Sequence, residues 1–184
     1  MIAFIGLGNT GAAYTNTKHN AGFWVLDELA KRYKLSFQPG EEEYIFVEYK
    51  QKKMILAKPT SGMNNSGNAV KHIAHYWGLL PSDIHVVVDD VDIPLGKIRI
   101  RPKGGDGSHR GMKNIIYHLQ SEQFPRIRLG IGTSENMRPS EKYVLKPFHK
   151  DYQHDVRTMI VRGADALEDV LFSGLNHAMN YFNS

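Results

Sequence analysis

The sequence predicts an α/β fold, formed by a single domain over residues 1–184 with a twisted, mixed and mostly parallel sheet flanked by helices. Short apolar, β-branched runs alternate with segments whose apolar residues recur every three to four positions, which is typical of strands alternating with helices. Polar, glycine-rich turns follow several of the apolar runs. With 41% hydrophobic residues the chain can bury one core, and no linker divides it.

The first half of the chain is expected to hold three strands and two helices. The apolar run Ile2–Ile5 predicts a buried strand. Helical spacing of apolar residues begins at Asn20, whose side chain we expect to cap that helix. Two strand-like runs joined by a polar turn predict a hairpin, which makes the sheet mixed. The expected ranges are 20–33 for the first helix, 44–49 and 53–57 for the hairpin, and 66–77 for the second helix.

The second half continues the alternation. The β-branched run 84–88 predicts a central strand that ends in the acidic sequence 89–92. Ile98 and Ile100 alternate with Arg99 and Arg101, which predicts a strand with one basic face. The expected elements that follow are a glycine-rich turn at 103–111, a helix at 112–119, a strand at 126–132, a loop or short turn at 139–143, a long helix at 151–172 and a short C-terminal helix.

Composition limits the classes of function. Lys and Arg together number 23 against 19 Asp and Glu, so the formal net charge of +4 permits a polyanionic partner. No run approaches the roughly 20 apolar residues of a membrane span, and no membrane partner is expected. The absence of cysteine excludes disulfides and thiolate metal sites and favours a cytoplasmic location.

The polar turns that follow the strands should meet at one edge of the sheet, because the carboxyl ends of parallel strands share an edge. The chain has no cysteine, no G-x-S-x-G elbow and no H-E-x-x-H motif, so we expect neither a covalent nucleophile of the usual kind nor a metal ion or cofactor. A histidine held by a carboxylate can instead take a proton from water, and amides can stabilise an oxyanion. The residues expected to converge are Asn9, His19, Asn20, Asn64, Asp89, Asp92, His109 and Arg110.

Other interpretations of the same residues stay open. Gly6, Gly8 and Gly11 fit the dinucleotide motif G-x-G-x-x-G, but the helical pattern starts only near Asn20 and the expected acidic residue is missing. Most asparagines and aspartates of this kind are turn or cap residues, and most histidines lie on surfaces. The N–H groups of the turn 104–107 and the next helix start could bind a phosphate, although a basic strand face can also be merely solvated.

The whole chain resembles the bacterial-type peptidyl-tRNA hydrolases, and five ordered motifs carry that resemblance. The motifs are GLGNTG at 6–11 with KHNAG at 18–22, PT at 59–60 with MNNSG at 63–67, DDVDIP at 89–94, GSHRGMK at 107–113 and RIRLGIG at 126–132. The resemblance implies a metal-independent, usually monomeric enzyme with a phosphorylase/hydrolase-like fold. It implies hydrolysis of the ester between a peptide and the 3′-terminal ribose of tRNA, in translation and ribosome rescue.

The resemblance also implies roles for individual residues. His19 would be the general base for water and Asp89 its partner, with Asn9 and Asn64 placing substrate and water. The substrate-binding and tRNA-binding candidates are Tyr14, Asn20, Met63, Arg101, Lys103, Arg110, Lys113 and Arg128.

The chain departs from the family pattern at three positions. Thr10 stands where proline is usual, Gly62 where a bulky residue is usual, and Arg110 where asparagine is usual. The alternative is a relative that keeps the fold and its basic face but serves as an RNA-binding splicing factor.

Overall fold

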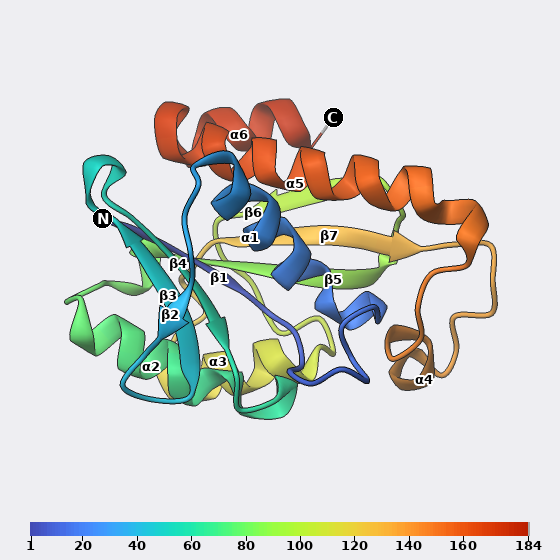
Figure 1. Ribbon diagram of the computed structural model, residues 1–184, viewed down its shortest axis with the longest axis horizontal. Coiled ribbons are helices and arrows are strands. Elements are labelled where there is room, and N and C mark those ends of the chain that lie inside the picture. The colour runs from blue at the N-terminus through green and yellow to red at the C-terminus, as the bar shows by residue number, and fades with distance from the viewer. Residues whose placement is uncertain (184) are drawn as a thin grey trace.

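A computed structural model describes residues 1–183, which form one seven-stranded sheet with helices on both faces (Figure 1). The strand order is β2-β3-β4-β1-β5-β7-β6. The central strands β4, β1, β5 and β7 run parallel, whereas β2, β3 and β6 pair antiparallel with their neighbours. The strands are β1 Ile2–Gly6, β2 Gln38–Pro39, β3 Tyr44–Tyr49, β4 Met54–Pro59, β5 Ile84–Pro94, β6 Ile98–Arg101 and β7 Arg126–Gly132.

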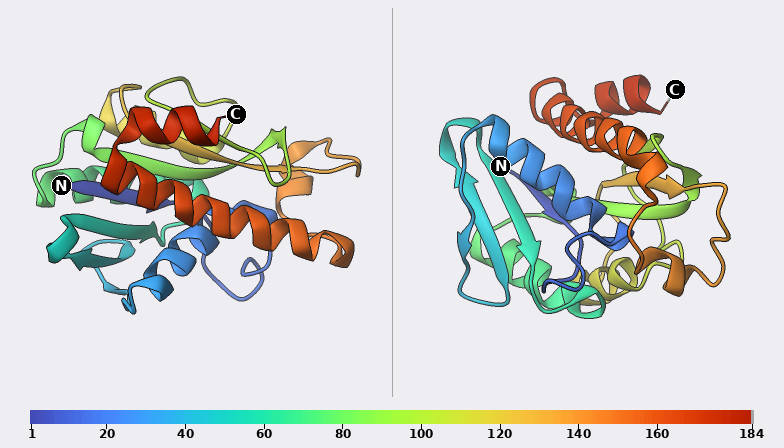
Figure 2. Two further views of the ribbon diagram at one scale, coloured as in Figure 1. Left: turned by 90° about the horizontal axis from the view of Figure 1, so that it is seen from above. Right: turned by 45° about the vertical axis from the view of Figure 1, so that its right-hand side comes forward.

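Helices cover the sheet in two layers. Helices α1, α5 and α6 lie on one face, and Figure 2 shows α5 and α6 lying across the strands. Helices α2 and α3 lie on the opposite face (Figure 1). The helices are α1 Ala21–Arg32, α2 Ser66–Tyr76, α3 Arg110–Leu119, α4 Ser140–Val144, α5 Gln153–Ser173 and α6 Leu175–Phe182. Within residues 1–183, no helix combines the length and apolar character that crossing a membrane requires.

The alternation of side chains along each strand divides the core between the two faces of the sheet. In β1, Phe4 packs with α1, α5 and α6, while Ala3 and Ile5 pack with α2 and α3. The central strands are apolar toward both faces because both are covered, as expected for the parallel part of a sheet. This burial makes the central strands a rigid base for the loops that leave their carboxyl ends.

The predicted fold class is confirmed, and most predicted elements are present within a few residues. Two details of the predicted elements were wrong. Strand β5 does not end before the acidic sequence but continues to Pro94, with a break in its pairing to β7 between Asp90 and Pro94. Residues 140–144 form a short helix, α4, where a loop or short turn was predicted at 139–143. Residue Ser184 of the predicted domain lies outside the described range.

The predicted cap at Asn20 is also wrong. Residues Lys18–Asn20 form a 3₁₀ turn that leads directly into α1, and the Asn20 side chain makes no capping hydrogen bond. It instead bonds the backbone of Asn9 twice: Asn9 N donates to Asn20 Oδ1 at 2.8 Å, and Asn20 Nδ2 donates to Asn9 O at 2.9 Å. Asn20 therefore fixes the glycine-rich loop after β1.

Candidate active site

A cleft of about 890 Å³ lies at the carboxyl ends of the parallel strands. Its walls come from the loops after β1 and β4, the end of β5, the loop between β6 and α3, and α4. Most of the predicted site residues line this cleft, and the two that do not are Asn20 and Lys113. The structure therefore brings together polar turns that are far apart in the sequence.

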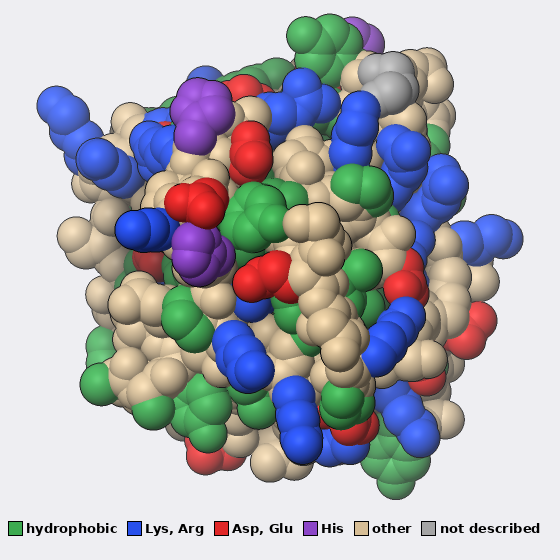
Figure 3. All heavy atoms as spheres, turned by 90° about the vertical axis from the view of Figure 1, so that its right-hand side faces the viewer, with side chains coloured by type: hydrophobic (Ala, Val, Ile, Leu, Met, Phe, Trp, Pro, Cys, Tyr) green, Lys and Arg blue, Asp and Glu red, His purple; other side chains and the backbone are tan. Residues whose placement is uncertain are grey.

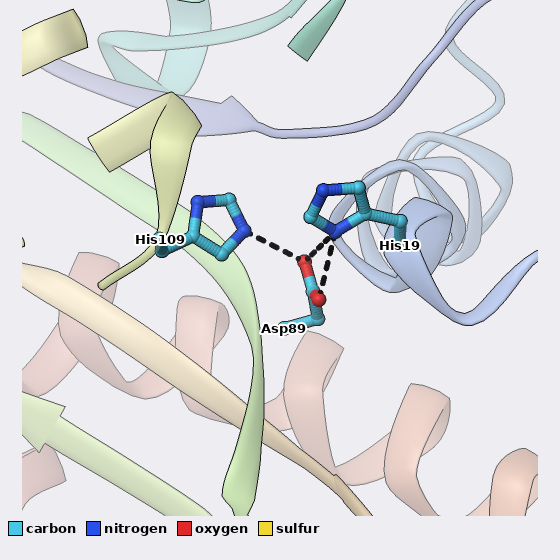
Figure 4. Close-up of side chains that lie close together, drawn as sticks. All are labelled: His19, Asp89 and His109. Atoms are coloured by element: carbon cyan, nitrogen blue, oxygen red, sulfur yellow. Dashed lines mark hydrogen bonds and ion pairs between the residues drawn. The ribbon is translucent and has the colours of Figure 1, made fainter. Parts of the chain in front are cut away.

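Two histidines bond one buried carboxylate at the base of the cleft (Figure 4). The Nδ1 atom of His19 lies 3.0 and 2.9 Å from the two oxygens of Asp89, and Nε2 of His109 lies 3.0 Å from Oδ1. The Asp89 side chain is only 2% exposed, against 13% for His19 and 12% for His109. Because Asp89 lies in the buried part of β5 while both histidines border the cleft, the carboxylate can orient the imidazoles without itself meeting a ligand.

Hydrogen bonding fixes which nitrogen of each ring carries a proton. The Met112 N–H donates to Nδ1 of His109, so Nε2 of His109 must be the nitrogen that donates to Asp89. An ionised Asp89 can only accept, so Nδ1–H of His19 also donates to it. Nε2 of neutral His19 then carries the lone pair.

The charges of this group shift two pKa values in opposite directions. Burial acts to raise the pKa of Asp89, but the adjacent His19 and His109 outweigh it and hold that pKa well below its ordinary value. Burial acts to lower the pKa of His19, but the charge and hydrogen bond of Asp89 raise it above the usual 6.5. Asp89 therefore stays ionised at neutral pH and stabilises the protonated form of His19.

A second network holds Asn9 beside the histidines. Asn9 Oδ1 accepts a hydrogen bond from the backbone N–H of Met63 at 2.8 Å. Because its oxygen is occupied, the NH₂ group of Asn9 is the end left to donate toward a ligand. Thr10 adds a second link between the same loops, since its hydroxyl donates to the carbonyl of Thr60 at 3.3 Å.

The backbone conformation explains why glycine stands at position 62. Its φ of 86° lies in the left-handed region that favours glycine, immediately before the 3₁₀ turn Met63–Asn65. This turn places Asn64 on the exposed rim of the cleft and buries the Met63 side chain at its wall. Tyr14, which is 38% exposed, borders the same cleft.

Basic side chains lie along one side of the cleft. Arg101 and Lys103 are exposed, and Arg128 is half-buried and donates from Nε to Asp90 at 2.7 Å. Arg110 is exposed and pairs with Glu141 of α4 at 2.8 Å. Lys113 points outward from α3 and does not border the cleft. Lys and Arg side chains are numerous over this face of the molecule, with Asp and Glu between them (Figure 3).

The glycine-rich loop between β6 and α3 offers less to a phosphate than its sequence suggests. The Asp106 side chain already accepts from the Ser108 N–H at 2.8 Å, and its carbonyl accepts from the His109 N–H at 3.0 Å. Arg126, which is buried, donates at 2.7 Å to the Gly105 carbonyl and so holds the loop from below. Basic side chains are therefore better candidates for phosphate contacts than these backbone groups.

Lys18 has a structural role that its place in the sequence does not predict. Its buried ammonium group lies 3.4, 3.3 and 2.9 Å from the carbonyls of Tyr143, Lys146 and Pro147, and 4.1 Å from the centre of the Tyr143 ring. Burial lowers the pKa of Lys18 from its usual value. Lys18 thus ties the turn that carries His19 to the segment that carries α4. Its position inside the KHNAG motif was the one available signal.

The three side chains His19, Asp89 and His109 also offer ligand atoms within 4.8 Å of one another, so they could in principle hold a metal ion. Two features favour a proton-transfer role instead. All three groups already satisfy one another by hydrogen bonds near 3 Å, and Asp89 is almost fully buried behind the two rings.

Known proteins match this chain over its whole length. The family model described as peptidyl-tRNA hydrolase matches residues 3–184. The peptidyl-tRNA hydrolase of Geobacillus thermodenitrificans is 42% identical over 185 residues, covering 100% of both chains, and that of Aquifex aeolicus is 40% identical over 97% of this chain and 94% of its own. The crystal structure of peptidyl-tRNA hydrolase from Acinetobacter baumannii superposes with a TM-score of 0.90 at 29% identity, covering 100% of this chain and 95% of that one. The chain therefore belongs to the peptidyl-tRNA hydrolase family.

Proposed function

We propose that this protein hydrolyses the ester bond between a peptide and the 3′-terminal ribose of tRNA, releasing free tRNA and peptide. Membership of the family supports this reaction. The observation that carries the mechanism is the bond of His19 Nδ1 to buried Asp89 at 2.9 Å, which leaves Nε2 of a cleft-lining histidine free to act as a base. The comparisons give no support to the alternative of an RNA-binding splicing factor.

In the proposed reaction, Nε2 of His19 removes a proton from a water molecule as that water attacks the ester carbonyl. The carbonyl oxygen becomes an oxyanion, toward which the NH₂ groups of Asn9 and Asn64 can donate. The imidazolium is stabilised by Asp89 and returns its proton to the departing 3′-oxygen of the ribose. The C–O bond breaks, and a carboxylic acid and a free hydroxyl are formed, while His19 returns to its neutral state.

His109 is a positioning residue in this mechanism. Its Nε2 bonds Oδ1 of Asp89, an oxygen that Nδ1 of His19 also contacts, and the Met112 N–H holds the other nitrogen of its ring. The ring centres of the two histidines are 4.9 Å apart, so both border the same part of the cleft. His109 therefore holds Asp89 in the orientation that His19 requires.

The dependence of kcat/KM on pH should report the protonation state of His19. A general base must be unprotonated, so kcat/KM should rise with pH through the pKa of His19. Because Asp89 raises that pKa, we expect the midpoint of the rise to lie above 6.5. Rates measured between about pH 5 and pH 9 would test this, and a midpoint below the ordinary histidine value would contradict the coupling of His19 to Asp89.

The basic side of the cleft should contact tRNA phosphates. We expect Arg101→Ala with Lys103→Ala to weaken tRNA binding and to reduce the slope of log K against log salt by about 1.5, because roughly 0.7–0.9 is lost per phosphate contact. Titration of tRNA at several salt concentrations would measure this slope. Lys31→Ala and Lys34→Ala together are a charge-matched control, because both lysines are exposed and neither lines the cleft. An unchanged slope would place the tRNA elsewhere.

We further propose that the protein acts in translation as a monomer in the cytoplasm, without a cofactor. Family membership supports the connection with translation. The basic residues along the cleft support contact with a nucleic acid.

A further inference from the structure

An exposed ion pair joins two walls of the cleft. Arg110 Nη2 lies 2.8 Å from Glu141 Oε1, and the two side chains are 64% and 67% exposed. Arg110 begins α3 directly after His109, whereas Glu141 lies in α4, so the partners come from distant parts of the chain. Both residues line the cleft, and a ligand that fills it would meet both.

A polyanion can replace the carboxylate in an ion pair of this kind. Exposed ion pairs are weak in water because solvent and salt screen them. A guanidinium group presents a planar pair of donors that fits a phosphate at least as well as a carboxylate. Arg101 and Lys103 line the same cleft, so this basic side of the cleft would attract a nucleic-acid strand that carries several phosphates.

We propose that Arg110 binds a phosphodiester of the substrate's 3′-terminal nucleotides by exchanging its ion-pair partner Glu141 for that phosphate, so that Glu141 competes with the substrate for the guanidinium group. The inference rests on the proposed function, because it concerns the same cleft. Arg110 follows His109, so the phosphate it binds would be fixed close to the histidines. Arg110 therefore contributes to substrate binding, and so to KM, rather than to the chemical step.

Comparing two substrates distinguishes a phosphate contact of Arg110 from other roles of this residue. N-acetyl-aminoacyl-tRNA carries the phosphates, whereas the N-acetyl-aminoacyl ester of adenosine carries none. We expect Arg110→Gln to raise KM for the tRNA substrate about tenfold, as for the loss of a charged hydrogen bond, and to reduce its salt slope by about 0.7. Arg110→Lys should retain most of the binding. The KM for the adenosine ester should change less than about twofold, and kcat should be nearly constant for both substrates.

Glu141→Gln tests the other half of the exchange. Freeing Arg110 from its competitor should lower KM for the tRNA substrate several-fold, and this gain should shrink when Arg110→Gln is also present. Glu135→Gln is the matched control, since it removes one negative charge from the segment between β7 and α4, at a residue that does not line the cleft. A gain from Glu135→Gln equal to that from Glu141→Gln would mean general repulsion and would overturn the exchange.

Other results would overturn either the exchange at Arg110 or the proposed function, and these results differ from one another. If Arg110→Gln raises KM equally for both substrates, Arg110 contacts the peptide or adenosine and the inference fails. A higher KM in Glu141→Gln would show that the ion pair supports the cleft wall rather than competing with substrate, and this too would overturn it. If the wild-type protein hydrolyses neither substrate, the proposed function itself has failed.

Discussion

Replacing His19 with alanine should lower kcat for N-acetyl-aminoacyl-tRNA by about 10²–10⁴, the usual contribution of a general base. The substitution deletes the base but removes no phosphate contact, so tRNA should bind with nearly the wild-type affinity. Single-turnover rates together with tRNA titration would measure the two effects separately. Asp89 would lose one of its two imidazole partners, so the folded state of the variant should be checked by circular dichroism.

The matched control for this experiment is His177→Ala. His177 of α6 is 61% exposed, pairs with Asp169 of α5, and does not line the cleft. We expect its rate and tRNA affinity to equal those of the wild type. Loss of rate and binding to the same extent in His19→Ala would contradict the role of His19 as a base and indicate a role in binding.

Replacing Asp89 with asparagine should also lower kcat by about 10²–10⁴. Asparagine keeps the shape but can present an NH₂ group to Nδ1 of His19, which favours the tautomer whose Nε2 carries the proton and cannot act as a base. The carboxylate that raises the pKa of His19 would also be lost. The rise of any residual kcat/KM with pH should therefore shift to lower pH.

The sign of this pH shift makes the prediction specific. A merely structural effect of Asp89→Asn would lower the rate at every pH without moving the midpoint. Asp151→Asn is a suitable control, because Asp151 is exposed and pairs with His149 outside the cleft. A midpoint that moves to higher pH in Asp89→Asn would show that Asp89 does not stabilise protonated His19.

The sequence was sufficient for the fold class because its periodic patterns agree with burial. The β-branched run of β5 and the helical spacing of α1 and α5 occur where the core is formed. It was also sufficient to expect that the loops after β1, β4 and β5 would meet, because parallel strands end at one edge. The structure places Asn9, His19, Asn64 and Asp89 around one cleft or at its base, while their individual roles stay predictions.

What the sequence could not provide depends on contacts between distant residues. Asn20 looks like a helix cap, but its amide bonds the loop at Asn9, eleven residues earlier. Lys18 looks like a surface lysine, but it is 2% exposed and bonded to carbonyls more than 120 residues away. The sequence also does not reveal the contribution of α4, because a five-residue helix is too short to show a periodic pattern of apolar residues.

The most direct test is multiple-turnover hydrolysis of N-acetyl-aminoacyl-tRNA by the purified wild-type protein, with EDTA in excess over divalent cations. We predict many turnovers per enzyme molecule and a rate that EDTA does not change, because His19 and Asp89 activate the water themselves. A folded protein that binds tRNA without cleaving the ester would contradict the proposed reaction. A rate that EDTA abolishes and a transition metal restores would instead show that His19, Asp89 and His109 serve as metal ligands.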